Sequence, residues 1–314
     1  MRGLLVVNPR ATTTSPRVID VIVHALSDEM DLDVTVTTHK GHGILLGELA
    51  LESELDAVVT LGGDGVVNEV VNGMLSRGPG AHVPMLATVP GGSANVFART
   101  LGLPTDAVEA TGLILERLRA GSIRTLGLGR ANDRWFVANA GLGIDAEIIA
   151  AMERHRKAGR SATPARYLTT TLNEFFRSTN RKEPALTLTR PPEPDGAGDD
   201  RLEGVFLAIV QNTSPWTFFG NWPMSPCPEA SFDSGLDAFA VRRMGIPTAL
   251  RTARRMLTSR TGGDVRGGIV VWHDVPEFTL AATRPVELQI DGEGMGSTTQ
   301  VVFTSHPEAL RVVA

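Results

Sequence analysis

The sequence predicts a two-domain protein, in which an α/β domain with a parallel sheet is followed by a larger β-rich domain built as an antiparallel sandwich or barrel. Three observations support this fold class. The chain has 314 residues, which is enough for two cores. Strand-like and helix-like segments alternate up to about Leu126, and short β-like runs separated by turn residues dominate afterwards. We therefore place the first domain at 1–125 and the second at 126–294, and we expect 295–314 to return to the first.

The first domain is expected to alternate strands with helices. Ser15 and Pro16 have the residue types of a helix N-cap and first turn, and apolar residues follow at helical spacing up to Leu26. The other expected elements are the strands Leu4–Val7, Val34–Thr37, Ala57–Leu61 and Pro84–Val89 and the helices Ile44–Leu51, Val66–Leu75, Ala94–Leu101 and Asp106–Ala120. Such alternation implies a parallel sheet with right-handed crossovers, and ligands of these sheets lie at the carboxyl ends of the strands.

The second domain is expected to be mostly β. Its β-like runs are Trp135–Ala138, Ala185–Thr189, Val205–Val210, Leu236–Val241, Ile269–Trp272, Phe278–Leu280, Val286–Ile290, Val301–Thr304 and Leu310–Val313. Two helical segments interrupt these runs, Ala146–Arg177 and Pro247–Ser259. Because turn residues separate most of the runs, an antiparallel sandwich or barrel is the expected arrangement.

Composition and charge narrow the classes of function. The net charge is −5, so the chain as a whole gives no reason to expect nucleic acid binding. The single cysteine, Cys227, excludes an internal disulfide framework and a cysteine-based zinc site, and it fits a reducing cytosol. The apolar run in MRGLLVV is too short for a signal-peptide core, and no run approaches the roughly 20 apolar residues that span a bilayer. We therefore expect a cytoplasmic protein whose membrane contact is peripheral.

Three loops leave the expected strand ends of the first domain, at Asn8–Thr14, Gly62–Gly65 and Pro90–Asn95. Glycines let backbone N–H groups approach an anion closely, and the helices after the second and third loops would aim their positive ends at the same region. Ser93 adds a hydroxyl donor, and Arg10 could reach a phosphate. Each loop alone is equally typical of a tight turn, but together they suit a di- or triphosphate held without a P-loop lysine.

Asp64 follows the glycine pair of the second loop, where a carboxylate would repel phosphate. The residue makes sense as a ligand of Mg²⁺, directly or through water, because magnesium usually keeps several waters and takes one or two carboxylates. It could alternatively take a proton from a hydroxyl, or cap the helix that begins at Val66. These three interpretations stay open from the residues alone.

The motifs then reveal a family resemblance. LGGDGVVNEVVNG is followed by PGGSANVFARTLGLP and preceded by VVNPRA, and later blocks read NAGLGIDAEI at 139–148, FDSGLDAF at 232–239 and QIDGEG at 289–294. In this order, the motifs resemble the diacylglycerol kinase catalytic family of soluble bacterial lipid kinases, related to sphingosine and ceramide kinases. GGDG by itself also occurs in NAD kinases and phosphofructokinases, so the resemblance depends on its combination with PGGSANVFAR and the late DGE.

The resemblance implies transfer of the γ-phosphate of ATP to a lipid hydroxyl with Mg²⁺, in a cleft between a phosphofructokinase- or NAD-kinase-like nucleotide domain and the β-rich domain. Asp64 would hold the metal, possibly a water away, and Glu293 matches the family's general base. By motif match, the cofactor-binding residues would be Asn8, Pro9, Arg10, Thr37, Gly62, Gly63, Gly65, Asn68, Glu69, Gly92 and Ser93. From the residues alone, Asp291-Gly292 between two β runs is typical of a hairpin turn, and a turn can also present a catalytic side chain.

Several positions depart from the family pattern. Val66 stands where a Thr is usual, Ser93 replaces another Thr, and Gly127 replaces a frequent Asp, so the kinase could be weak or its site simplified. The motif for a structural metal in the second domain is poorer in acids than usual. A structural Mg²⁺ at Asp233 is therefore a weaker expectation, and Asp233 and Asp237 could simply flank a turn and strand.

Two features favour a lipid surface as a partner. Pro215–Met224 packs four aromatic residues into PWTFFGNWPM, which is typical either of a core crossover or of the rim of an apolar cleft. Six arginines and no acid lie between Arg242 and Arg260, and a second basic run lies at 154–160. These runs could bind an anionic bilayer or could be solvated helix faces.

The prediction is thus an ATP- and Mg²⁺-dependent lipid kinase, cytoplasmic and peripherally membrane-associated, that converts diacylglycerol to phosphatidate. Another acceptor is one alternative: a sphingoid base, a ceramide-like lipid or a glycolipid. A non-catalytic nucleotide or lipid sensor that kept the fold is the other. No nucleic acid partner is expected, and the oligomeric state is left open, with a homodimer as one alternative.

Overall fold

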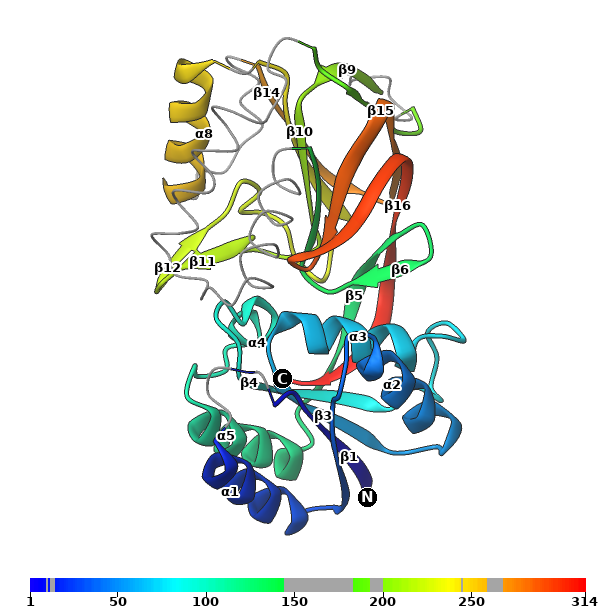
Figure 1. Cartoon of the computed structure of the whole chain (residues 1–314), viewed down its shortest axis with the longest axis vertical. Coiled ribbons are helices and arrows are strands. Elements are labelled where there is room, and N and C mark those ends of the chain that lie inside the picture. Colours follow the sequence, from blue (N-terminus) through cyan, green and yellow to red (C-terminus); the bar gives the residue numbers. More distant parts are fainter. Residues whose placement is uncertain (10, 12–14, 144–182, 193–199, 244, 259–267) are drawn as a thin grey trace. The chain divides into compact units, whose positions relative to one another are not determined.

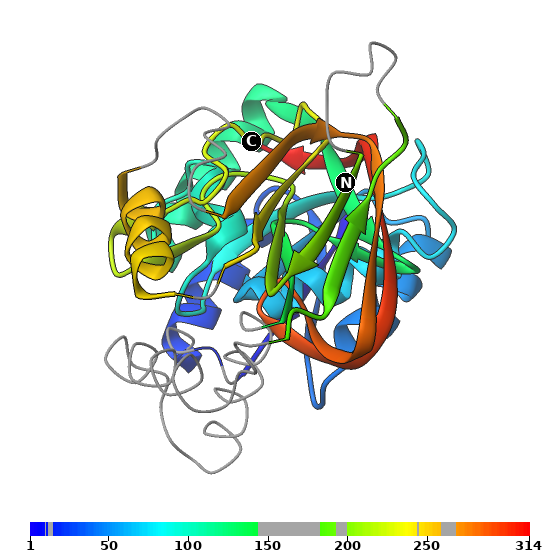
Figure 2. The same cartoon turned by 90° about the horizontal axis from the view of Figure 1, so that it is seen from above.

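The computed structural model describes residues 1–9, 11, 15–143, 183–192, 200–243, 245–258 and 268–314. The chain divides into two compact units, of which the first is Met1–Leu128 with Pro307–Ala314 and the second is Gly129–His306. The fold class is confirmed: the first unit is α/β with parallel strands, and the second is mostly antiparallel β (Figures 1 and 2). The helix expected over Ala146–Arg177 lies outside the described residues.

The sheet of the first unit has the order β4-β3-β1-β2, and all of its pairings are parallel. Its strands are β1 (Arg2–Val7), β2 (Asp31–Val36), β3 (Ala57–Gly62) and β4 (Met85–Pro90). Its helices are α1 (Pro16–Ser27), α2 (His42–Glu52), α3 (Asp64–Met74), α4 (Val96–Thr100) and α5 (Ala107–Ala120). The paired helices α1 and α5 cover one face and α2 and α3 the other, so β3 is buried along its whole length (Figure 1).

Glycines allow α2 and α3 to pack at backbone contact. A Cβ atom added to Gly47 of α2 would lie 2.3 Å from the carbonyl oxygen of Val70, and one added to Gly73 of α3 would lie 2.0 Å from that of Ile44. Real Cβ atoms do not come this close to backbone oxygens, so no larger residue fits at either position. This close crossing fixes the position of α3, which begins at the glycine-rich loop.

The second unit contains one long described helix and the remaining strands, except for the start of β5 and the end of β16, which belong to the first unit. They are β5 (Ile123–Ala131), β6 (Arg134–Phe136), β7 (Asn139–Gly143), β8 (Leu186–Thr189), β9 (Arg201–Val205), β10 (Leu207–Gln211), β11 (Thr217–Phe219), β12 (Trp222–Met224), β13 (Leu236–Val241), β14 (Ile269–Val275), β15 (Glu277–Ile290), β16 (Glu293–Val313) and α8 (Ile246–Thr258). The main sheet runs β14-β13-β10-β7-β15-β16. The aromatic rings of Phe136, Phe278 and Phe303 pack in its core, with Phe278 stacked on Phe303 at 5.2 Å.

Two long strands replace four of the expected short ones. β15 joins the runs expected at 278–280 and 286–290, because its pairing with β16 shifts register between Ala281 and Val286 without ending. β16 likewise joins the runs at 301–304 and 310–313 across Pro307 and Glu308, and Glu308 takes a positive φ of 52°. Residues such as Pro that normally end strands thus occur here at irregularities within continuous strands.

The chain passes between the units within β5 and within β16. The expected return of 295–314 to the first domain differs from the structure: only Pro307–Ala314 belongs to the first unit, where Val312 pairs in parallel with Leu86 of β4. Residues 295–306 belong to the second unit, because they pair with β15. No helix in the described parts of the chain has the length and apolar character to cross a membrane.

Candidate active site

The three expected loops come together at the carboxyl edge of the first unit's sheet. The N–H of Asn8, just after β1, donates to the carbonyl of Leu61 at 2.9 Å, and the N–H of Gly91, just after β4, donates to that of Gly62 at 2.7 Å. Thr37, just after β2, donates its N–H to Val7 at 2.8 Å. The strand ladder therefore continues into the loops and holds them beside one another.

The glycines of the second and third loops pack backbone against backbone. A Cβ atom on Gly92 would lie 2.6 Å from the Cα atom of Gly63, and one on Gly91 would lie 3.0 Å from the Cα atom of Gly62. The sequence prediction assigned these glycines to the approach of an anion. The structure gives them a further role, because side chains here would push the two loops apart.

Asp64 is the first residue of α3, and its carboxylate reaches the next loop. Its Oδ1 accepts the backbone N–H of Phe97 in α4 at 3.0 Å. Burial raises the pKa of Asp64, while hydrogen bonds from the N–H groups of Phe97 and Val96 oppose that shift. The cap of α3 is Gly63, which has no side chain, so the interpretation of Asp64 as the cap of its own helix is wrong. Asp64 instead stabilises the start of α4, as an anion placed among backbone N–H groups does.

The start of α4 also differs from the expectation. The helix expected from Ala94 begins at Val96, because Asn95 takes a left-handed conformation with φ of 48°. The Asn95 side chain closes the loop on itself: Oδ1 accepts the N–H of Gly92 at 2.8 Å, and Nδ2 donates to the carbonyl of Gly92 at 2.9 Å. The loop motif predicts no role for Asn95, although Asn is among the few non-glycine residues that readily take this conformation. Ser93 is left exposed within this loop.

Glu69 is buried, and both of its carboxylate oxygens are bound by backbone. Oε1 accepts the N–H of Gly41 at 2.7 Å, and Oε2 accepts the N–H of Gly43 at 2.9 Å. Gly41 is the N-cap of α2, so Glu69 neutralises the positive end of that helix and ties α2 to α3. Asn68 is also buried, and its Oδ1 accepts the side-chain N–H of Asn72 at 3.2 Å. Both residues hold the helices behind the loop, and their contact with a nucleotide stays a prediction.

The remaining residues of the predicted nucleotide site differ in exposure. Pro9 is exposed, Asn8, Thr37, Gly63 and Gly65 are half-exposed, and Gly62 is buried. Arg10 lies outside the described residues.

The DGE segment of the second unit forms the expected hairpin turn. Asp291 and Gly292, with φ of 46° and 78°, connect β15 to β16, and Glu293 is the first residue of β16, paired with Ile290. Two consecutive positive φ values are typical of the type I′ hairpin turn, which favours an Asp-Gly sequence. Glu293 itself is half-exposed. The turn therefore presents the candidate base at the end of a strand.

A buried polar network fixes this turn. The carboxylate of Asp291 accepts three backbone N–H groups, from Val137 at 2.9 Å, Ala138 at 2.9 Å and Asn139 at 3.0 Å. Gln289 accepts the N–H of Gly292 at 2.9 Å and donates to the side chain of Asn139 at 3.0 Å. Because these groups are buried, removing one partner leaves others without a hydrogen bond.

The expected structural metal at Asp233 has no supporting cluster. Asp233 is exposed, and its N–H donates to the hydroxyl of Ser231. The neighbouring Asp237 is buried, and it binds His273 Nδ1 at 2.8 Å and the N–H of Asp274 at 3.1 Å. Within the described ranges, no group of three or more His, Cys, Asp or Glu side chains is placed to hold a metal ion. The carboxylate of Asp64 still fits a magnesium ion that arrives with nucleotide phosphates, because such an ion needs only one or two protein carboxylates.

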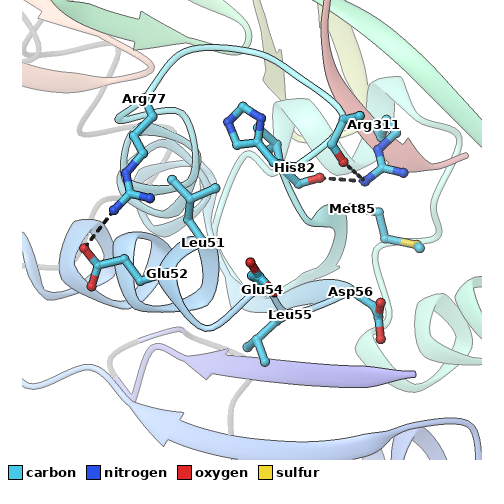
Figure 3. Close-up of a pocket in the computed structure, with 11 residues that line it drawn as sticks. Leu51, Glu52, Glu54, Leu55, Asp56, Arg77, His82, Met85 and Arg311 are labelled. Carbon is cyan, nitrogen blue, oxygen red and sulfur yellow. Dashed lines mark hydrogen bonds and ion pairs between the residues drawn. The ribbon is translucent and has the colours of Figure 1, made fainter.

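A cavity of about 500 Å³ lies at the opposite, amino edge of β3 and β4 (Figure 3). Arg77 and Glu52 form an exposed ion pair at 3.3 Å on its wall, and Arg311 donates to the carbonyl of Val83 at 2.7 Å. None of the predicted site residues lines this cavity. The candidate site is therefore assigned to the loop edge, where the chemistry-bearing residues lie.

The comparisons with known proteins agree with the loop motifs. Residues 2–131 match the family model of the diacylglycerol kinase catalytic domain. A Pseudomonas aeruginosa (strain UCBPP-PA14) protein named "Probable lipid kinase YegS-like" is 29% identical over 282 residues, which cover 90% of this chain and 84% of that protein. A Staphylococcus epidermidis (strain ATCC 35984) "Diacylglycerol kinase" is 37% identical over 97 residues, which cover 31% of this chain and 28% of that protein.

The fold itself is shared with a solved structure. A crystal structure described as a diacylglycerol kinase from Bacillus anthracis str. Sterne superposes with a TM-score of 0.75, covering 99% of this chain and 96% of that one at 24% identity. At this level of identity the likeness supports the fold alone. Support for lipid kinase chemistry comes instead from the sequence matches.

Proposed function

We propose that this chain, whose residues 2–131 match the diacylglycerol kinase catalytic domain, is a lipid kinase that transfers the γ-phosphate of ATP to the hydroxyl of diacylglycerol and releases phosphatidate and ADP. The observation that carries this proposal is the meeting of three loops at one sheet edge, with Asp64 and the exposed Ser93 on two of them. The backbone N–H groups of these loops and the Ser93 hydroxyl suit a polyphosphate.

In the proposed site, Asn8, Thr37, Gly63, Gly65 and Ser93 contact the nucleotide. Pro9, Arg10, Gly62, Asn68, Glu69 and Gly92 complete the proposed set. Glu69 and Asn68 act as positioning residues, because their polar groups are already bound within the unit. Asp64 would hold a magnesium ion, which would neutralise charge on the transferred phosphate.

The transfer step requires one proton acceptor. The lipid hydroxyl oxygen forms a bond to the γ-phosphorus while the bond to the β–γ bridging oxygen breaks, and ADP leaves with that electron pair. Glu293 accepts the hydroxyl proton, a role worth about 10²–10⁴-fold in rate. The fixed hairpin supports this role, because the network that holds the turn involves Asp291 and Gln289 and leaves the Glu293 side chain half-exposed.

The acceptor is the least constrained part of the proposal. The long match is to a protein named as a lipid kinase without an acceptor, whereas the match to a named diacylglycerol kinase covers 31% of this chain. A different lipid hydroxyl, as in a sphingoid base or a glycolipid, is therefore the second candidate substrate.

One experiment tests both the reaction and the acceptor. The protein is incubated with γ-labelled ATP, Mg²⁺ and a mixed lipid extract, beside the variant Asp64→Asn. We expect one labelled lipid, formed by the wild type alone and identified by mass as phosphatidate. A labelled lipid of another mass would identify a different acceptor. ATP binding without any labelled lipid would contradict the proposed kinase activity and favour a non-catalytic sensor.

A further inference from the structure

Helix α8 presents one exposed face that is both basic and apolar. Leu250 is 67% exposed, and Arg251 and Arg254 on the same face are exposed as well. The other side anchors the helix, because Thr248 is buried and Met256 packs on the small core around Trp216. The helix is thus held by one side, while its outer side carries long side chains in solvent.

A short hairpin beside α8 adds an exposed tryptophan. β11 and β12 pair antiparallel, and α8 packs against β12 on the same flank of the second unit (Figures 1 and 2). The N–H of Ser225 donates to the carbonyl of Met256 at 3.0 Å, and Arg255 Nε donates to that of Pro226 at 2.8 Å, which fixes the hairpin to the helix. Trp222 of β12 is 71% exposed. The other three tryptophans, Trp135, Trp216 and Trp272, are buried.

We propose that Trp222, Leu250, Arg251 and Arg254, here called the α8 surface, dock the protein on an anionic lipid bilayer. The charge complementarity is local: no acid lies between Arg242 and Arg260, although the chain as a whole has a net charge of −5. Arginines bind lipid phosphates, and tryptophan and leucine enter the boundary between head groups and acyl chains. An acidic protein partner could also bind the arginines, and the vesicle experiments below separate that alternative from a bilayer.

The inference rests on the proposed function only in naming lipid as the occupant, and binding can be measured without catalysis. Trp222 is the natural reporter, because it is the exposed tryptophan among four. Addition of vesicles containing phosphatidylglycerol should shift tryptophan emission to the blue, and neutral phosphatidylcholine vesicles should not. Trp222→Phe should remove this shift while leaving flotation with the vesicles largely intact.

Variants that remove arginines measure the electrostatic contribution to vesicle binding. Arg251→Gln with Arg254→Gln should weaken flotation with anionic vesicles about 25-fold, or about fivefold for each basic group, and added salt should weaken wild-type binding. The matched control is Arg201→Gln with Arg284→Gln, which removes the same charge from exposed strand positions of the same unit and should bind like the wild type. The α8 variant should keep its activity on a short-chain diacylglycerol in free solution and lose it on vesicles.

Three results would overturn the proposal. The α8 and control variants could float equally well, or the wild type could fail to bind anionic vesicles. The wild type could also form a dimer that the α8 variant breaks, which would assign this face to a second copy. A chain with no kinase activity but with α8-dependent flotation would reject the proposed reaction and keep the docking surface, so the two failures are distinguishable.

Discussion

The two candidate catalytic acids, Asp64 in the first unit and Glu293 in the second, are presented in different ways. Asp64 helps to hold its own surroundings, because its carboxylate binds the N–H of Phe97 at the start of α4. Glu293 stands on a turn that another carboxylate, Asp291, fixes through three backbone hydrogen bonds. Asp64 thus combines a structural role and a proposed chemical role in one side chain. In the second unit, Asp291 holds the turn and Glu293 has the proposed chemical role. This difference predicts which substitutions alter stability and turnover together.

The largest effect is expected at Asp64. Asp64→Ala removes the proposed metal ligand and leaves the N–H of Phe97 without its acceptor, so turnover should vanish and the free energy of unfolding should fall by about 1.5–3 kcal/mol. Asp64→Asn keeps an acceptor oxygen and should lose turnover with a smaller loss of stability. Lipid phosphorylation and urea unfolding of both variants check this expectation. Equal destabilisation by the two variants would contradict the role of the Phe97 hydrogen bond.

Glu293→Gln should give the next largest effect, mainly on chemistry. Turnover should fall by about 10²–10⁴-fold, because the proton acceptor is lost. The affinity for ATP should stay at the wild-type value, and the melting temperature should change less than in Asp291→Asn, because the Asp291 carboxylate holds the turn through three backbone hydrogen bonds. The control is Glu277→Gln at the exposed start of β15. If the turnover of Glu293→Gln stayed near normal, the proton acceptor would have to be Asp64 or water and not Glu293.

Asp291→Asn should show the reverse pattern, with a large effect on stability and a moderate one on turnover. The new amide group cannot accept all three backbone N–H groups, and an unmatched buried donor costs about 1–3 kcal/mol. Turnover should fall by about tenfold, as an expected consequence of a looser turn under Glu293. Chemical denaturation and steady-state kinetics measure the two effects.

The matched control for that change is Asp233→Asn, which makes the same substitution at an exposed position. It should leave both quantities unchanged. If Mg²⁺ stabilises the wild type but does not stabilise Asp233→Asn, the result would instead support a structural metal at this position.

The smallest expected effect is a pH dependence that comes from Asp64. Because burial raises its pKa in the folded protein, the folded state favours the protonated carboxyl. The stabilisation from this shift is present below the ordinary pKa of an Asp and is lost as pH rises through the raised value. As pH rises above the ordinary Asp pKa of about 3.9, the melting temperature of the wild type should therefore fall relative to that of Asp64→Asn, which does not titrate. A relative rise would show that the hydrogen bonds from Phe97 and Val96 outweigh burial.

Local patterns were enough for most of the first unit. The alternation of apolar strands and amphipathic helices predicted β1, β3, β4 and α5 to within two residues at each end, and the strand-end glycines predicted the loop edge. Two kinds of difference remain. α4 begins late because of a local contact, in which Asn95 folds back on Gly92 three residues earlier, whereas β15 and β16 continue past residues that usually end strands because the two strands pair with each other.

The sequence by itself determined the family motifs, the α/β order and the hairpin at Asp291-Gly292, because each depends on residues close together in the chain. Only the tertiary structure decided what the polar side chains bind. Asp64 and Phe97 are 33 positions apart, Glu69 and Gly41 are 28 apart, and Asp291 and Ala138 are 153 apart. A carboxylate's partner over such separations depends on how whole strands and helices pack, which no local pattern of residues specifies.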